Sequence, residues 1–229
     1  MSSSTEHHPE PTVAAHGHYA GEAEPEYAHV MVTVSAAGSD RDRVLEQLVR
    51  RVDEIRQLIG GYGEAVERVE GHPLRGGPRF KDKKPTEKVN GYAASTDLGV
   101  FVVDFTALGE LVLRLADLDM VAIAGPHWAL RPDSPAHTRA RSQAVRDARV
   151  RAEEYAAALG ANLTGLVEIA DTDLSGPDSS RPHAAGVPLA RTSRGSSVAD
   201  RVELDLAPVR QKVYATVVTR FTMSQPDFP

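Results

Sequence analysis

The clearest hydrophobic pattern in the chain is a row of alanines that recurs at every fourth residue within residues 134–160. The row consists of Ala136, Ala140, Ala144, Ala148, Ala152 and Ala156. Residues four apart lie on one face of an α-helix, so the row predicts one long helix. Ser134 and Pro135 suit the first positions of that helix, and Gly160 suits the left-handed turn that ends one. We expect these small side chains, Ala148 among them, to let the helix lie close against a sheet.

Two further segments have the apolar period of a helix. The first spans residues 39–61, with Ser39 as its N-cap and Gly60 at its end. Its apolar stripe consists of Val44, Leu48, Val52, Ile55 and Ile59. The second begins at Asp104, and its apolar positions are Leu108, Leu111, Val112, Leu115 and Leu118. The chain is therefore expected to contain three main helices.

Alternating or continuous apolar runs predict strands in the rest of the chain. They lie at residues 12–20, 27–37, 65–74, 87–104, 120–131, 162–170 and 210–223. The acidic stretch 21–26 is interpreted as a hairpin connection between the first two strands. This order of elements predicts an α+β fold, an antiparallel or mixed β-sheet with the three helices packed on it as a sandwich. Residues 212–223 are expected to form a sheet edge that could pair with a second copy of the chain. The alternative is that a loop or the N-terminal strand covers this edge.

The organisation along the chain is that of a single domain with polar ends. Residues 1–11 are polar and contain proline, which predicts a disordered lead. Residues 12–224 form the predicted domain, and 225–229 form a short tail. Within the domain, residues 174–200 are rich in Ser, Pro, Gly and Arg without any period, which predicts a mobile loop.

Composition excludes several classes of function. The chain has 229 residues, of which 41% are hydrophobic, and a formal net charge of −6. An acidic chain is a poor general ligand for nucleic acid, because such binding depends on a cationic surface. The absence of cysteine excludes thiolate metal sites and a thiol nucleophile. The sequence contains no run of about 18 apolar residues, so it predicts no membrane-spanning helix. The N-terminus lacks the basic and apolar regions of a signal peptide, so we expect a cytoplasmic protein.

Four stretches of sequence resemble those of a known family. They are Glu24-Pro25-Glu26 before an alternating strand, GYAAS at residues 91–95, FTALGELVLRLADLD at 105–119, and ARSQAVRDARVRAEEYAAALGANLTGLVEIAD at 140–171. Together they are similar to the SIMPL-domain family. The similarity extends in order from about residue 12 to residue 223, and the helix and strand within 140–171 carry most of it.

The resemblance implies an α+β fold but no chemistry. Members of this family are mostly bacterial envelope or periplasmic proteins, with links to oxidative stress and host antigenicity, and an animal member is an adaptor for a signalling kinase. The family has no established catalytic residue set, so the resemblance implies neither a catalytic residue nor a cofactor. The missing signal peptide departs from the bacterial pattern.

Histidines supply one candidate site. His16 and His18 lie two apart on a predicted strand and project from the same face. Across the predicted hairpin, His29 could approach them. Three imidazoles would suit Zn²⁺ or Cu²⁺, but no carboxylate at a recognised spacing completes the set. We therefore assign no metal site and keep these three residues as candidates only.

A basic segment supplies the second candidate. Residues 75–88 hold four of the five lysines and are expected to form a loop that could contact an anionic partner surface. The candidate contact residues are Arg75, Arg79, Phe80, Lys81, Lys83, Lys84 and Lys88. The alternative is a solvated loop whose charges serve solubility, and the overall acidity of the chain favours it.

No catalytic motif accompanies these candidates. The sequence lacks a Gly-x-Ser-x-Gly elbow, a Walker loop and a His-Glu-x-x-His pair, and Trp128 and Tyr155 are interpreted as core residues. The sequence therefore predicts a protein that is not an enzyme and needs no cofactor. Its predicted role is that of an interaction or assembly module, related to stress, which binds a second copy or another protein. The alternative is a small-ligand or metal-binding protein that uses His16, His18 and His29.

Overall fold

The computed structural model describes residues 10–80, 89–171 and 206–227. Lys81, Lys83, Lys84 and Lys88, the loop predicted at 174–200 and most of the predicted lead lie outside the described residues. Within the domain predicted for residues 12–224, the chain separates into two compact units. The described part of unit 1 comprises 10–23, 131–171 and 210–227, and that of unit 2 comprises 24–80, 89–130 and 206–209.

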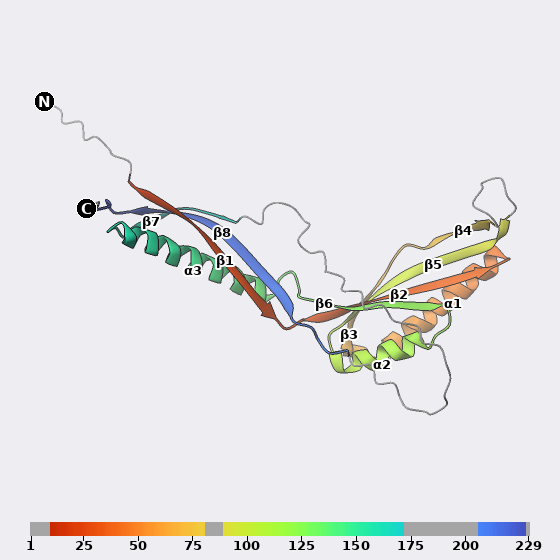
Figure 1. Ribbon diagram of the computed structural model, residues 1–229. Helices are drawn as coiled ribbons and strands as arrows, with labels where there is room; N and C mark the ends of the chain where they lie inside the picture. The colour runs from red at the N-terminus through yellow and green to blue at the C-terminus, as the bar shows by residue number, and fades with distance from the viewer. Residues whose placement is uncertain (1–9, 81–88, 172–205, 228–229) are drawn as a thin grey trace, which may run out of the picture. The chain divides into compact units, whose positions relative to one another are not determined.

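Unit 1 is a three-stranded antiparallel sheet with one helix on it (Figure 1). Its elements are β1 (Thr12–Ala23), α3 (Pro135–Ala158), β7 (Leu163–Asp171) and β8 (Gln211–Met223). The strand order is β1-β8-β7, so β8 is central and the edges are β1 and β7. Residues 212–223 are therefore not a sheet edge, and the alternative holds in which the N-terminal strand covers them. The predicted hairpin is also wrong, because β1 pairs along its whole length with β8.

Helix α3 confirms the prediction drawn from the alanine row. Ser134 caps its start, with its side-chain oxygen accepting from the Ala136 backbone N–H at 3.2 Å. The five alanines from Ala140 to Ala156 have no exposed surface and face β1 and β8. The approach is so close that a Cβ on Gly17 of β1 would lie 2.7 Å from the Cβ of Ala148. Tyr155 is 57% exposed, so its assignment to the core is wrong.

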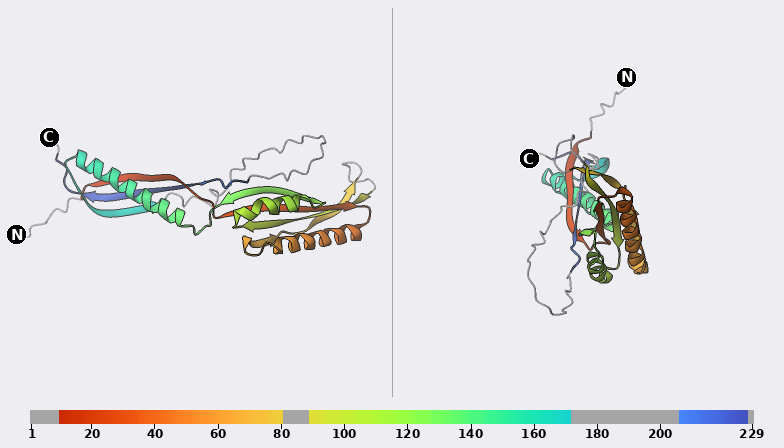
Figure 2. Two further views of the ribbon diagram at one scale, coloured as in Figure 1. Left: turned by 90° about the horizontal axis from the view of Figure 1, so that it is seen from below. Right: turned by 90° about the vertical axis from the view of Figure 1, so that its right-hand side faces the viewer.

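Unit 2 is a five-stranded antiparallel sheet with two helices packed on one face (Figures 1 and 2). Its elements are β2 (Tyr27–Gly38), α1 (Arg41–Gly60), the 3-10 turn η1 (Gly63–Ala65), β3 (Val66–Gly71), β4 (Arg75–Phe80), β5 (Val89–Val102), α2 (Phe105–Ala116) and β6 (Val121–Ala129). The strand order is β3-β5-β2-β6, and β4 pairs with β5 beyond the end of β3. With unit 1, this confirms an α+β fold built from antiparallel sheets and three helices.

The core of unit 2 is made of large aliphatic side chains. Alternate residues of β2, from Ala28 to Val34, are fully buried against the apolar stripes of α1 and α2. Helix α1 is capped by Asp40 rather than by Ser39: the Asp40 carboxylate accepts from the backbone N–H of Asp42 at 3.0 Å. Asp40 has an extended backbone and directly precedes the first helical residue, which is the conformation of an N-cap. The other residues of β2 point to the sheet face opposite the helices.

The segment 75–80 corrects a further prediction. It was expected to be loop, yet it forms β4, and its residues Arg75 to Phe80 pair with β5 from Ser95 to Val89. Two glycines and a proline within six residues hide the strand from a propensity argument. In the part of the chain that the structure describes, no helix has the length and apolarity needed to cross a membrane.

Candidate functional site

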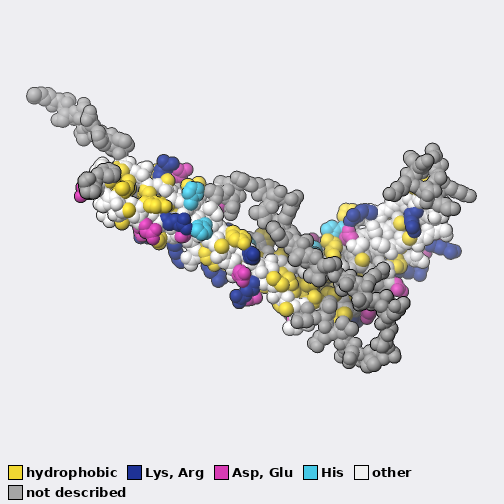
Figure 3. Space-filling model, in the orientation of Figure 1, with side chains coloured by type: hydrophobic (Ala, Val, Ile, Leu, Met, Phe, Trp, Pro, Cys, Tyr) yellow, Lys and Arg dark blue, Asp and Glu magenta, His cyan; other side chains and the backbone are white. Residues whose placement is uncertain are grey.

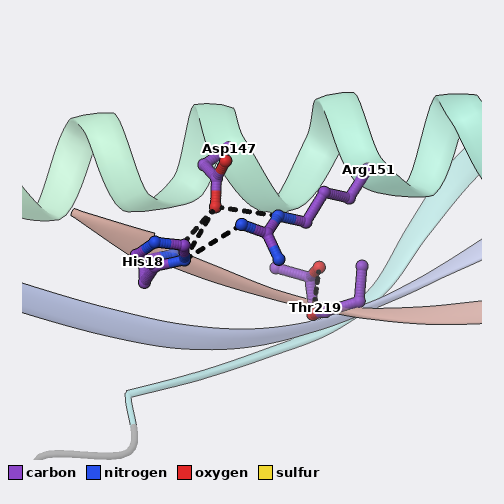
Figure 4. A network of polar contacts seen from close by, with 5 residues as sticks. His18, Asp147, Arg151 and Thr219 are labelled. Carbon is purple, nitrogen blue, oxygen red and sulfur yellow. Dashed lines mark hydrogen bonds and ion pairs between the residues drawn. The ribbon is translucent and has the colours of Figure 1, made fainter.

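His18 of β1 in unit 1 contacts helix α3, although its side chain is 62% exposed, and the neighbouring candidate His16 is exposed as well. Asp147 and Arg151 project from successive turns of α3 toward His18 (Figure 4). The Asp147 carboxylate accepts from the backbone N–H of His18 at 2.9 Å and lies 3.1 Å from the Arg151 Nε. The Arg151 Nη2 lies 3.0 Å from the Nδ1 of His18.

The contact between Arg151 and His18 has a defined direction. A guanidinium can only donate, so in this contact the His18 Nδ1 is the acceptor. The same Nδ1 lies 3.5 Å from Asp147, an ion pair only for a protonated ring. The His18 backbone N–H, followed by the Arg151 side chain, holds the pKa of Asp147 below its ordinary value.

This group joins strand β1 to helix α3. A nucleophilic dyad needs a free hydroxyl or thiol beside the imidazole. The nearby Thr219, also drawn in Figure 4, is buried and donates its hydroxyl to the Ala15 carbonyl at 3.1 Å. The contact instead satisfies one backbone N–H on β1, an edge strand of its sheet.

His29 belongs to the other sheet and lies in a different set of side chains. Cross-strand register places four residues in one line across the open face of unit 2: Arg68 of β3, Phe101 of β5, His29 of β2 and His127 of β6. We call these four residues the open-face row. The Phe101 ring stacks on the His29 ring with their centroids 4.6 Å apart. The Arg68 Cζ lies 3.5 Å from the centroid of the Phe101 ring. The His29 and His127 rings are 6.4 Å apart.

The surroundings of His29 disfavour its charged form. Burial is the largest cause of its lowered pKa, and the charge of His127 is the next. Glu70 acts in the opposite direction, while His72 and Arg68 add to the lowering. Gly99 of β5 makes room for the ring, since a Cβ there would lie 2.9 Å from the His29 Nε2. His29 is therefore a half-buried, neutral imidazole near neutral pH.

The three predicted histidines are thus not brought together. Among the residues described, no group of three His, Cys, Asp or Glu side chains could hold a metal ion. His127 and Arg68 were missed by sequence reasoning because their place in the row follows from strand order, and neither lies at a motif spacing. The available signal was the alternation of side chains along β2. The even-numbered residues from Ala28 to Val34 face the core, so the odd-numbered His29 lies on the opposite face of the sheet.

The described part of the basic segment carries one anchored arginine. Arg75 of β4 forms an ion pair with Asp97 of β5, and that carboxylate also accepts from the Thr33 hydroxyl at 2.6 Å. Asp97 thereby joins β4, β5 and β2. Arg79 and Phe80 are exposed at the end of β4, beside the lysines that lie outside the described residues.

Strand β7 presents a surface that the sequence did not single out. Leu166, Val167 and Ile169 are 57%, 54% and 50% exposed, and we call them the β7 strip. Helix α3 packs mainly on β1 and β8, so among the described elements little covers β7. In the space-filling view, hydrophobic side chains reach the surface among charged and histidine side chains (Figure 3). A strand that reads as apolar in sequence is normally assigned to the core, which is why its exposure was not predicted.

Comparison with known proteins places the chain in a family. The model of the SIMPL family, described as "Protein of unknown function (DUF541)", matches residues 13–221. A search of curated proteins finds no match. Among solved structures, "Crystal structure of a hydrolase from Listeria innocua" is similar at 14% identity and a TM-score of 0.23, over 90% of this chain and 91% of that chain, and so weak a likeness carries no argument about activity. The match over almost all of the chain, together with the α+β fold, shows that this protein belongs to the SIMPL family.

Proposed function

We propose that this protein acts by binding another polypeptide rather than by catalysis, and that it pairs through β7 with a second copy of the chain. The observation that carries the proposal is the β7 strip: three large apolar side chains, each at least half exposed, on the edge strand of unit 1. An edge strand presents backbone N–H and C=O groups that can hydrogen-bond to another strand. Apolar side chains beside those groups add burial to the pairing.

The two edges of unit 1 differ in how they are guarded. On β1, Asp147 occupies the N–H of His18. On β7 the sequence from Leu163 to Asp171 contains neither lysine nor proline, the residues that commonly block edge pairing. Its one glutamate, Glu168, lies 3.7 Å from Arg220 of β8, so that carboxylate is already partnered. The pairing of β7 with β8 contains register shifts, which also disfavour pairing of the β7 edge with another strand. The apolar side chains of β7 stay exposed despite these shifts.

A second copy is the occupant that these features favour. Two antiparallel β7 strands can meet about a two-fold axis, so each contributes the same surface and the assembly closes as a dimer. Glu168 is already paired with Arg220, which reduces the repulsion between the two copies at that contact.

The proposal is tested by measuring mass with light scattering after size exclusion. At about 50 μM, an interface with a micromolar Kd would be largely occupied. We expect the wild type to be a dimer and Ile169→Lys to be a monomer, because lysine at the edge opposes strand pairing. Val150→Lys is the matched control, since Val150 on α3 is also 50% exposed but lies off the sheet. A monomeric wild type, or equal dissociation of both variants, would overturn the proposal.

A further inference from the structure

The open-face row lies in unit 2 and takes no part in the strand pairing proposed for unit 1. Its two histidines lie side by side on β2 and β6, with Arg68 from β3 two places away along the same line. We propose that the open-face row is an acid-sensitive latch: while the His29 ring is neutral, the end of β6 from His127 to Ala129 stays paired with β2, and protonation of His29 opens that end.

The latch rests first on what surrounds His29. On one side its ring stacks against Phe101, whose other neighbours are the guanidinium of Arg68 and the ring of Tyr27 at 5.6 Å. On the other side stands His127. A proton on His29 would place a cation between a histidine and an arginine in a half-buried position, where like charges are weakly screened.

Acidic groups do not cancel this effect. Glu70 of β3 favours the protonated form of His29, but its carboxylate is already bound at 2.8 Å by the Arg68 Nε. His72, which follows β3, opposes protonation. Among the described residues, β3 and its extension contribute Arg68, Glu70 and His72 around the ring, β5 contributes an uncharged phenyl ring, and β6 contributes His127. Arg68 is also paired with Glu67 at 3.0 Å.

The second support is the backbone at the β6 end of the row. The β2–β6 register shifts between His29 and Met31, and Gly125 lies within β6 at this irregularity. Gly125 has a φ of 116°, and a Cβ there would lie 2.8 Å from the His29 carbonyl oxygen. The hydrogen-bond ladder is therefore interrupted beside the histidine pair, and β6 is an edge strand. Local opening of the end from His127 to Ala129 separates it from residues 27–29 of β2 and breaks the bond from the Glu26 N–H to the Ala129 carbonyl, while the ladder beyond the register shift stays intact.

The sign of the pH effect follows from the lowered pKa of His29. A histidine with a lower pKa in the folded state binds protons more readily after unfolding or local opening. The closed face is then fully stable above the ordinary value of 6.5, and its stability falls as the pH drops through 6.5 toward the folded-state pKa. For one linked proton, the ratio of open to closed forms rises about tenfold per pH unit in that window.

The chain contains its own reporter for the experiment. Trp128, the single tryptophan, follows His127 on β6 and packs edge-on against Phe105 at 4.8 Å. We would titrate the full-length protein from about pH 7.5 to about pH 5 and follow the wavelength of its emission maximum. The wild type is expected to shift to longer wavelength as β6 opens. His29→Gln should lose the shift, and His16→Gln, which removes an exposed histidine of unit 1, should keep it.

A second measurement keeps the proposal open to refutation if His29→Gln folds poorly. Imidazole resonances of the wild type, followed by nuclear magnetic resonance over the same titration, should show His29 titrating together with the emission shift. An emission maximum that stays constant to about pH 5 would overturn the latch, and so would the same shift in a folded His29→Gln protein.

Discussion

The two units bury their sheets in opposite ways. Unit 1 packs alanines against a glycine, so that the backbones of α3 and β1 almost touch at Gly17. Unit 2 separates its helices from the sheet by interlocking Val, Leu and Ile side chains. The stability of unit 1 depends on small side chains that allow α3 and β1 to lie close together. The stability of unit 2 depends on large side chains that fill the space between its helices and its sheet. The two units should therefore fail under opposite kinds of substitution.

The largest effect is expected from removing volume in unit 2. Leu111 of α2 has no exposed surface, and Leu111→Ala leaves a cavity among the aliphatic side chains. We expect the free energy of unfolding to fall by about 2–5 kcal/mol. Denaturant titration followed by Trp128 fluorescence measures it within this unit. The control Val49→Ala removes an exposed apolar residue of α1 and should change stability by less than about 0.5 kcal/mol.

The next effect comes from adding volume in unit 1. Ala148→Leu forces a larger side chain between α3 and Gly17 and should cost about 1–3 kcal/mol. Arg146→Leu makes the same residue at an exposed position of the helix and should cost far less. Hydrogen exchange of peptides from α3 and β8 distinguishes the two. Equal protection in both variants would mean that the alanine row is not a close contact.

The same contact can be approached from the strand. Gly17→Ala should also loosen α3, because the added Cβ would lie 2.6 Å from the backbone nitrogen of Ala148. Gly77→Ala on β4 is the matched control, since a Cβ there meets nothing within 4 Å. Similar hydrogen exchange in both variants would contradict this account of Gly17.

A smaller effect is expected at the buried hydroxyl of unit 1. Thr219→Val keeps the shape of the side chain but leaves the Ala15 carbonyl without this donor. The cost should be about 1 kcal/mol, measured by exchange of β8 peptides. A neutral result would show that the carbonyl finds another donor.

The smallest effect concerns the guard on the β1 edge and depends on pH. Asp147→Ala removes the acceptor of the His18 N–H and should cost about 0.5–1.5 kcal/mol near neutral pH. Because the folded-state pKa of Asp147 lies below 3.8, its contribution is present above 3.8 and is lost as the pH falls through that folded-state value. The deficit of Asp147→Ala should therefore shrink under acid. Glu154→Ala removes an exposed carboxylate from the same helix and should show no such deficit.

The fold was predictable where local pattern decides it. The alanine row, the cap at Ser134, the start of the second helix at Asp104 and the apolar stripes of α1 and α2 follow from residue types and their spacing, and the structure confirms them. Strand pairing was not predictable in the same way, because alternation shows which face of a strand is buried but not which strand lies beside it. That limit explains the wrong hairpin, the wrong edge at 212–223 and the open-face row that no motif revealed.

The discontinuity of unit 1 has a consequence for how the protein is made. Ala15 and Thr219, joined by one hydrogen bond, are 204 positions apart, and β1 is paired with β8 alone among the described strands. The described strands of unit 2 all lie between residues 27 and 129, so its sheet can form as soon as that stretch has left the ribosome. Strand β1 is thus synthesised well before β8, its partner in the sheet. Formation of unit 1 therefore requires closure of the long stretch of chain between these two strands. Any chain shortened before residue 211 would lack the central strand of that sheet and would leave β1 without a partner.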